Sequence, residues 1–380
     1  MKTPLAWLNL LHDKMRTLVA IAGVAFAVVL ILMQIGFLNS VRQTATQIYD
    51  QLNFDILLIS PQYQSISKAG SFSRIRLYQA ESVPGVAEAH PLYLDFSLWM
   101  NRTHAREDAS RRGIFVIGFP LEQRPFRLPA LAGDLRPLKE PGRVYMDELS
   151  RKQFGNWRKS TDLEIGGKKV EVAGTYRMGT GFGADGDVVV GDETFRELFP
   201  QRTRDEPSLG LVRVKPGFDP QAVADDLRRR LPRDVNVYTR REIERKERQH
   251  WVTRTSVGVI FSLGVVVGLI VGVAIVYQVL SSDIANHQSE YATLKAMGYS
   301  GRYLASVVLE QAIILAVAGF CPGWAFSFLL YDITEQRAHI PMRMGWELSA
   351  SILVLSIVMC AISGVAALRK VNAADPADLF

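Results

Sequence analysis

The glycine-rich stretch GTGFGADG, residues 179–186, is a candidate phosphate-binding loop by its composition. It follows one predicted strand and precedes another, DVVVG, whereas a dinucleotide-binding loop must open a helix whose N-terminus holds the phosphates. The favoured interpretation is therefore a mobile loop or tight turn. Gly179, Gly181 and Gly183 are the candidate residues that shape it, and whether it binds anything is left open.

No sequence motif of a catalytic or metal site occurs in the 380 residues. A P-loop (G-x-x-x-x-G-K-[ST]), a nucleophile elbow (G-x-S-x-G), H-E-x-x-H and C-x-x-C are all missing. The six histidines are dispersed, and none pairs with another at ligand spacing. The net charge of +6 is not accompanied by a helix-turn-helix, zinc-finger or RNP pattern. We therefore expect no catalytic residue, no metal and no cofactor on this chain, and no nucleic-acid partner.

Four long apolar stretches dominate the organisation of the chain. They are residues 18–38, 255–281, 303–330 and 348–368. They contain no Lys, Arg or Asp, and Glu310 is their only charged residue. Each is long enough for a helix to cross about 30 Å of hydrocarbon, which takes roughly 20 residues. This pattern excludes a purely soluble protein and a disordered one, and it predicts four transmembrane helices.

The Lys and Arg residues of the short flanking segments predict the orientation. Seven lie in residues 1–17, 282–302 and 369–380, against two in the opposite short loop, residues 331–347. Both termini are therefore expected in the cytoplasm, and residues 39–254 outside it.

The large inserted segment, residues 39–254, has the pattern of an α+β domain. Two β-α-β units are expected, near residues 54–99 and 211–238, with a mostly β subdomain at 113–191 between them. Thr239 and Glu242 form a capping box that starts a charged helix, which we expect to run unbroken into the second span. Residues 39–50 contain no Gly or Pro and could prolong the first span. Two such helices would make stiff stalks.

Small and polar residues within the spans suggest where helices meet. Gly264, Gly268 and Gly272 recur every four residues, which lets another span or a second copy of the chain approach closely. Gly23 in the first span is a further packing candidate. Glu310 could have a function, reach the headgroup region or accept hydrogen bonds, and its role is left open.

A short amphipathic helix that ends at Gly298 is expected within residues 282–302, whose sequence is SDIANHQSEYATLKAMGYSGR. Its apolar face carries Ile284, Tyr291, Leu294 and Met297. Such a helix could lie on the bilayer surface or dock into a groove of a soluble partner.

Several segments resemble FtsX/MacB-type ABC transporter permeases. The opening residues 6–28, with Lys14–Thr17 and Gly23, are similar to the start of these proteins, and residues 290–310 resemble their coupling region. Residues 174–195 and 367–380 are most similar to the DevC subgroup. The Cys321-Pro322 pair in the third span departs from the family pattern, which leaves the local helix shape open.

The resemblance implies a homodimer in the cell inner membrane that works with a cytoplasmic ABC ATPase dimer, which binds the ATP and Mg²⁺. The ATPase would dock at the coupling helix. The resemblance also implies a periplasmic membrane-fusion adaptor and a TolC-like outer-membrane channel, with export of a lipid, glycolipid, peptide or drug. The alternative is an FtsX-like regulator of a cell-wall hydrolase or a lipoprotein-release permease, and an unrelated membrane-anchored sensor or enzyme is the third possibility. The residues expected to dock the ATPase are Ile284, Glu290, Tyr291, Leu294, Lys295, Met297 and Gly298.

Overall fold

The computed structural model describes residues 14–102, 111–160, 162–179, 183–286, 297, 301–338 and 341–372. The chain divides into two compact units. One contains Val41–Thr255, here called the inserted domain, and the other contains the segments on either side of it.

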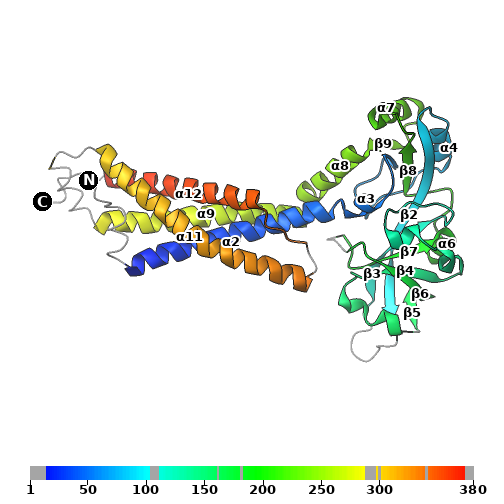
Figure 1. Ribbon diagram of the computed structural model, residues 1–380, viewed down its shortest axis with the longest axis horizontal. Coiled ribbons are helices and arrows are strands. Elements are labelled where there is room, and N and C mark those ends of the chain that lie inside the picture. The colour runs from blue at the N-terminus through cyan, green and yellow to red at the C-terminus, as the bar shows by residue number, and fades with distance from the viewer. Residues whose placement is uncertain are drawn as a thin grey trace. The chain divides into compact units, whose positions relative to one another are not determined.

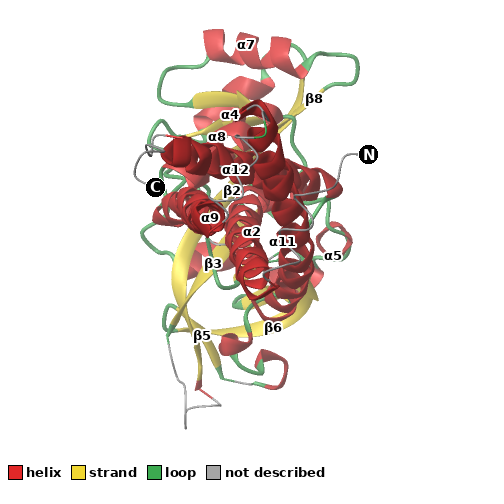
Figure 2. Ribbon diagram, turned by 90° about the vertical axis from the view of Figure 1, so that its left-hand side faces the viewer, coloured by secondary structure: helices red, strands yellow, loops and turns green. Residues whose placement is uncertain are grey.

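The flanking unit is built from four long apolar helices, whose bounds are α2 (Lys14–Thr44), α9 (Ser256–Asn286), α11 (Gly301–Ala338) and α12 (Trp346–Asn372). All four are long and apolar enough to cross a membrane. Figure 2 shows them side by side, seen nearly along their axes. Their shared core includes Val24, Val28, Leu315 and Ile352. The fold class expected from the sequence, four spans with an α+β domain between the first two, is confirmed.

One half of the inserted domain takes strands from both of its chain ends. Its elements are β1 (Ile56–Ile59), α4 (Ile75–Glu81), β2 (Val86–Asn101), β8 (Leu209–Val214), α7 (Pro220–Arg230) and β9 (Asn236–Thr239). The strand order is β2-β8-β1-β9, with every neighbouring pair antiparallel. This is the split β-α-β arrangement of ferredoxin-like domains. The helix α7 begins where Asp219 accepts hydrogen bonds from Gln221 N and Ala222 N, as an N-cap residue does.

The other half is a closed ring of six strands. Its elements are β3 (Arg112–Phe119), α5 (Pro129–Ala132), β4 (Arg143–Asp147), β5 (Leu163–Ile165), β6 (Lys168–Tyr176), β7 (Asp187–Gly191) and α6 (Asp192–Leu198), with short 3₁₀ turns at Arg136–Lys139, Lys152–Phe154 and Trp157–Lys159. The pairings run β2-β3-β7-β4-β6-β5 and return to β2, so the sheet closes as a barrel. One buried cluster receives side chains from all six strands: Tyr93, Trp99, Ile114, Val116, Val144, Met146, Leu163, Ile165, Val170, Val188 and Val190.

The strand β2 joins the two halves. Its first part, up to Leu92, pairs with β8, and its second part, from Tyr93, pairs with β3 and β5. Figure 1 shows this long strand passing from β8 toward β3 and β5. Because a single strand belongs to both sheets, the two halves share one backbone ladder.

The stalk expectation was wrong in one respect, because the charged helix does not run unbroken into the second span, whereas α2 does continue past the first apolar stretch as far as Thr44. The helix α8 (Arg240–Thr253) ends before α9 begins at Ser256, and two residues separate the end of α2 at Thr44 from α3 (Gln47–Gln51). Thr253 and Thr255 each donate a side-chain hydrogen bond to the carbonyl four residues earlier. Such bonds slightly destabilise a helix and often bend it.

Candidate functional site: the α3–α8 junction of the inserted domain

The segments nearest the two apolar helices in the sequence, α3 and α8, meet inside the inserted domain. The helix α8 starts with the capping box expected from the sequence, in which Thr239 N donates to Glu242 Oε2 at 2.7 Å. Glu242 also accepts from Arg228 at 2.5 Å. The hydrogen bonds from Thr239 and Arg228 lower the pKa of Glu242 against the opposing effect of its burial. The start of α8 is thereby fixed against α7.

Arg240, the first residue of α8, holds the end of α3. Its guanidinium donates to the carbonyl oxygens of Tyr49 at 2.6 Å and Leu52 at 2.7 Å. It also donates to Phe54 O at 2.8 Å and lies 4.0 Å from the centre of the Phe54 ring. The last carbonyls of a helix have no partner within it, so a planar cation with several donors is well suited to this end. Burial lowers the pKa of Arg240, and the charges of Glu244, Asp50 and Asp55 oppose that shift.

Glu247, about two turns further along α8, is a fully buried carboxyl group. It accepts hydrogen bonds from Tyr63 Oη at 2.7 Å, Ile66 N at 3.0 Å and Trp251 Nε1 at 3.3 Å. Tyr63 uses its only proton for Glu247, so the 2.5 Å contact between the two tyrosine hydroxyls must be donated by Tyr49. Burial raises the pKa of Glu247, while the three donors oppose the shift.

We call Arg240, Glu247, Tyr49 and Tyr63 the α3–α8 clasp. Tyr49 belongs to α3, and Arg240 and Glu247 belong to α8, so the clasp fastens both helices to the segment 54–66. A partly satisfied buried network would be costly, whereas one with several partners for each polar group makes the contact rigid. The sequence does not predict the clasp, because Glu247 lies within a run of charged residues, RREIERKERQ, that is typical of an exposed helix.

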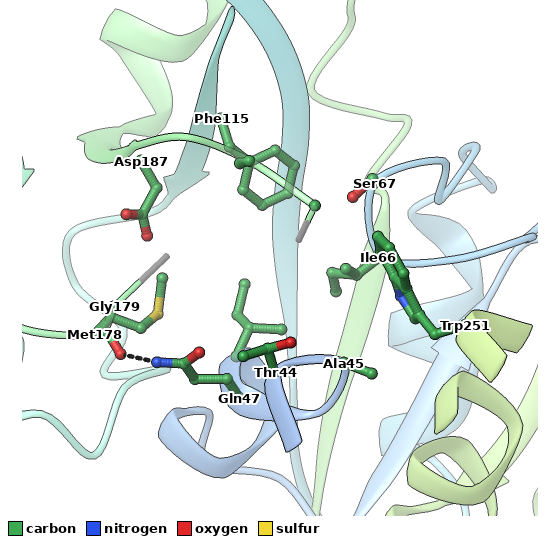
Figure 3. A pocket seen from close by; sticks show the side chains of 13 residues that line it. Thr44, Ala45, Gln47, Ile66, Ser67, Phe115, Met178, Gly179, Asp187 and Trp251 are labelled. Atoms are coloured by element: carbon green, nitrogen blue, oxygen red, sulfur yellow. Dashed lines mark hydrogen bonds between the residues drawn. The ribbon is translucent and has the colours of Figure 1, made fainter. Parts of the chain in front are cut away.

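A cavity of about 70 Å³ lies beside the clasp, within the inserted domain. Its walls come from α3, the segment 66–67, β3, the segments 178–179 and 183–187, and α8 (Figure 3). Gln47 donates to Met178 O across one side of it. Two of the glycines expected to shape a loop, Gly179 and Gly183, line this cavity, and Gly181 lies outside the described residues. Gly179 has a φ of +94°, which favours glycine.

Two buried carboxyl groups, Asp147 and Asp187, lie at the cavity end of the barrel. Asp147 Oδ1 accepts from Leu149 N and Met178 N, and its Oδ2 accepts from Gly179 N at 2.6 Å. Asp187 lines the cavity. Burial, and then the charge of Asp147, raise the pKa of Asp187 well above the ordinary aspartate value. Burial raises the pKa of Tyr176 in the same way. Among the described residues, no group of three or more His, Cys, Asp and Glu side chains could hold a metal ion.

The small residues of the spans lie against other helices of the same chain. A Cβ placed on Gly268 would lie 3.0 Å from Ile31 Cγ1 of α2, and one on Gly272 would lie 2.8 Å from Ala27 Cβ. A Cβ on Gly264 would meet Gln34, also in α2, and one on Gly23 would meet Ile275 of α9. Of the two alternatives, another span or a second copy of the chain, these contacts correspond to the first. Glu310 is exposed on α11.

Most of the expected ATPase-docking residues lie outside the described part of the chain. These are Glu290, Tyr291, Leu294, Lys295 and Gly298. Ile284 lies in the last two turns of α9, and Met297 is exposed. The expectation of a coupling helix at these positions stays a prediction.

Two families match the chain. Residues 17–230 match the MacB-like periplasmic core domain, and residues 262–376 match the FtsX-like permease C-terminal family. The uncharacterized ABC transporter permease Rv2563 of Mycobacterium tuberculosis (strain ATCC 25618 / H37Rv) is 24% identical over 380 residues, covering 97% of this chain and 96% of the relative. A second permease of the same strain, Rv0072, is 23% identical over 370 residues, covering 94% and 93%.

Two solved structures also match part of the chain. The extracellular domain of the noncanonic ABC-type transporter YknZ from Gram-positive bacteria has 15% identity and a TM-score of 0.33, covering 49% of this chain and 100% of its own. The periplasmic region of MacB from Actinobacillus actinomycetemcomitans has 8% identity and a TM-score of 0.34, covering 52% and 94%. From the two family matches, the chain belongs to the MacB/FtsX-type permeases of ABC transporters, which are multi-pass membrane proteins that rely on a separate ATPase subunit.

Proposed function

We propose that this permease subunit transmits ATP-driven conformational change from its ATPase to the inserted domain, as part of a tripartite export system. The cargo class would be a lipid, glycolipid, peptide or drug that leaves the periplasm. The proposed assembly has two copies of this chain, an ATPase dimer that carries ATP and Mg²⁺, a membrane-fusion adaptor and a TolC-like channel. The chain would lie in the inner membrane with both termini in the cytoplasm, and DevC-type permeases would be its nearest subgroup.

The α3–α8 clasp is the observation that carries this proposal. Only two residues separate α2 from α3, and two separate α8 from α9. Both α3 and α8 are fastened inside the inserted domain by Arg240 and Glu247. A displacement of either apolar helix would therefore reach a rigid attachment point, whereas a flexible linker rich in Gly and Ser would absorb it.

The motif content of the chain supports a role as a transmitter of force. No P-loop or other catalytic motif occurs in the full sequence. The free energy for any transport must therefore come from the partner ATPase. The chain would contribute only the mechanical connection and the surfaces that the cargo and the adaptor meet.

The test measures the movement of the inserted domain directly. The full chain and its ATPase would be reconstituted in nanodiscs, with Cys321→Ser, Cys360→Ser and a spin label at Ala222→Cys, an exposed position on α7. In a dimer, this single label reports one distance between copies. We expect ATP with vanadate to shift that distance, and Glu247→Ala to abolish the shift while ATP hydrolysis continues. The control Glu122→Ala, at an exposed position, should keep it.

Two outcomes would count against the proposal. An unchanged distance in the otherwise unmodified chain would mean that ATP does not move the inserted domain. A normal shift in Glu247→Ala would mean that the clasp is not the transmitting element. Labelling Ala222→Cys in intact cells with a membrane-impermeant maleimide tests the orientation. Copurification with a cell-wall hydrolase in place of an adaptor would favour the regulatory alternative.

A further inference from the structure

Three basic side chains lie on one face at the end of α8. Lys246, His250 and Arg254 follow one another at intervals of four residues, which places them above one another along a helix. Arg254 N donates to His250 O at 2.8 Å, so the helical spacing extends as far as Arg254. Arg254 is exposed, and Lys246 and His250 are half-buried.

A fourth basic residue, Lys68, comes from a turn that is held against α8. Lys68 N donates to Ser65 O at 2.9 Å and closes the turn. Ile66 N, within the turn, donates to Glu247 Oε1 of α8 at 3.0 Å. The Lys68 side chain is exposed. The hydrogen bond to Glu247 thus fixes the backbone that carries Lys68 beside the last turns of α8.

Lys68, Lys246, His250 and Arg254 are here called the basic cluster. Burial, and then the charges of Arg254, Lys246 and Lys68, lower the pKa of His250. A charge acts strongly on a pKa when it lies within about 4–6 Å, so the effect agrees with the placement of all four side chains on one patch of surface.

The acidic residues of α8 do not neutralise this patch. Two of them form ion pairs with arginines outside the cluster: Glu242 with Arg228, and Glu244 with Arg240 and Arg248. Glu247 is buried and accepts its hydrogen bonds from Tyr63, Ile66 and Trp251. Within the part of the chain that the structure describes, no member of the basic cluster forms an ion pair. Since like charges four residues apart repel, an anion from outside the chain would relieve this repulsion.

The basic cluster is close to a membrane-spanning helix along the chain. Arg254 is two residues before Ser256, where α9 begins, and the apolar stretch of α9 also begins at Ser256. Four helical residues and two further residues separate His250 from Ser256, a distance of no more than about 15 Å. Lipid headgroups occupy the layer just outside the hydrocarbon. Their phosphates are therefore the abundant anions nearest to the cluster.

We propose that the basic cluster binds the phosphate of an anionic lipid headgroup, in the leaflet on the side of the inserted domain. Arg and Lys side chains form charge-assisted hydrogen bonds with phosphate oxygens, and the imidazole of His250 can donate another. A lipid bound here would hold the end of α8 at the membrane surface. This inference goes beyond the proposed function and does not depend on it, because it applies to either orientation of the chain.

The full chain in nanodiscs is the sample, and dioleoylphosphatidylglycerol is the probe. It is mixed into dioleoylphosphatidylcholine, which has the same acyl chains and no net charge. The six histidines would carry ¹³C at Cε1, and the resonance of His250 would be assigned through His250→Gln. We expect that resonance to shift and to saturate as the fraction of phosphatidylglycerol rises. Inorganic phosphate, added to nanodiscs of phosphatidylcholine alone, should not reproduce the shift, because it lacks the acyl chains that keep a headgroup beside the cluster.

Two double variants remove the same charge from different parts of the inserted domain. Lys68→Gln combined with Arg254→Gln should raise the half-saturating fraction of phosphatidylglycerol at least about tenfold, since two basic residues near an anionic surface are lost. Arg241→Gln combined with Arg245→Gln, closer to the start of α8, should leave that fraction unchanged. All four residues are exposed, so both chains should fold, which thermal unfolding checks.

Three results would overturn the inference. The first is a His250 resonance that does not respond to phosphatidylglycerol. The second is the same shift with inorganic phosphate, which would assign the cluster to a free anion and not to a lipid. The third is an equal response of the folded Lys68→Gln, Arg254→Gln chain and the unmodified chain. That result would show that the charge of the whole membrane surface, and not the cluster, shifts the resonance.

Discussion

Glu247 Oε2 accepts a hydrogen bond of 2.7 Å from Tyr63 Oη, although 184 residues separate the two in the sequence. The bond joins the last helix of the inserted domain to a segment that follows its first strand. Together with the bonds of Arg240 to the end of α3, it ties the two chain ends of the domain to each other. The two chain ends of the inserted domain are therefore tied to each other within the domain itself.

Replacing Arg240 by Lys should destabilise the inserted domain. The planar guanidinium donates to three carbonyl oxygens and stacks on Phe54, whereas an ammonium group is a point charge that cannot reproduce that fork. We expect a loss of about 1–3 kcal/mol, which corresponds to a fall in Tm of roughly 2–4 °C for each kcal/mol in a domain of this size. Thermal unfolding of the full chain in detergent, followed by tryptophan fluorescence, measures it.

Arg241→Lys is the matched control, because the neighbouring arginine is exposed. Its Tm should stay within about 2 °C of that of the unmodified chain, since surface substitutions rarely change stability by more than about 0.5 kcal/mol. If both variants unfold at the same temperature as the unmodified chain, Arg240 does not hold α3.

The parts of the fold that depend on local composition could be predicted from the sequence. The four spans follow from long runs in which Glu310 is the only charge, and the start of α8 follows from the spacing of Thr239 and Glu242. The closure of the barrel could not be predicted, because it depends on pairings such as Phe115 with Asp187 that lie far apart in the chain. The burial of Glu247 depends on Tyr63 in the same way.

The proximity of Asp147 and Asp187 could not be predicted from the sequence either. Asp147 ends the strand RVYMD and Asp187 begins the strand DVVVG, so each looks like a residue at a solvated strand end. Only the parallel and antiparallel pairings of β4, β6 and β7 bring these ends together. The break between α8 and α9 was not predicted either: Thr253 and Thr255 bond to the helix backbone beside it, but Ser327 and Ser356 make the same bond inside the continuous helices α11 and α12.

The stability of the inserted domain should depend on pH through Glu247. Burial raises its pKa above the ordinary value of 4.5, so the folded chain holds this proton more tightly than the unfolded chain does. Stability from this group is therefore fully present below the unfolded pKa and is lost as the pH rises through the folded pKa. We expect the Tm difference between the unmodified chain and Glu247→Gln to shrink as the pH rises from about 4 toward neutrality.

Glu122→Gln provides the baseline for this measurement, because Glu122 is exposed. Its Tm should follow the unmodified chain at every pH. A Tm difference for Glu247→Gln that stays constant with pH, or grows as the pH rises, would show that Glu247 does not gain its proton on folding.

Enlarging Gly268 should disrupt the packing of the spans. A Cβ at this position would lie 3.0 Å from Ile31 Cγ1 and 3.6 Å from Leu30 Cβ of α2, so a leucine cannot fit unless α2 and α9 separate. Gly268→Leu should lower the Tm of the full chain in detergent by several degrees, since overpacking costs about 1–3 kcal/mol. Val267→Leu, at an exposed position one residue earlier, should not. A normal Tm for Gly268→Leu would rule out this contact as a close one.

The predicted coupling helix can be tested without knowledge of the cargo's identity. Leu294→Arg places a charge on the expected apolar face, and Glu290→Trp replaces an acidic residue by a bulky apolar one. Either change should break the connection between ATPase and permease while the chain still inserts normally. We expect the ATP-dependent shift of the Ala222→Cys label to disappear while ATP hydrolysis by the complex continues. Ser289→Asn, a polar replacement off the expected apolar face, is the control and should keep the shift. If both substitutions preserve the shift, the ATPase docks elsewhere on the chain.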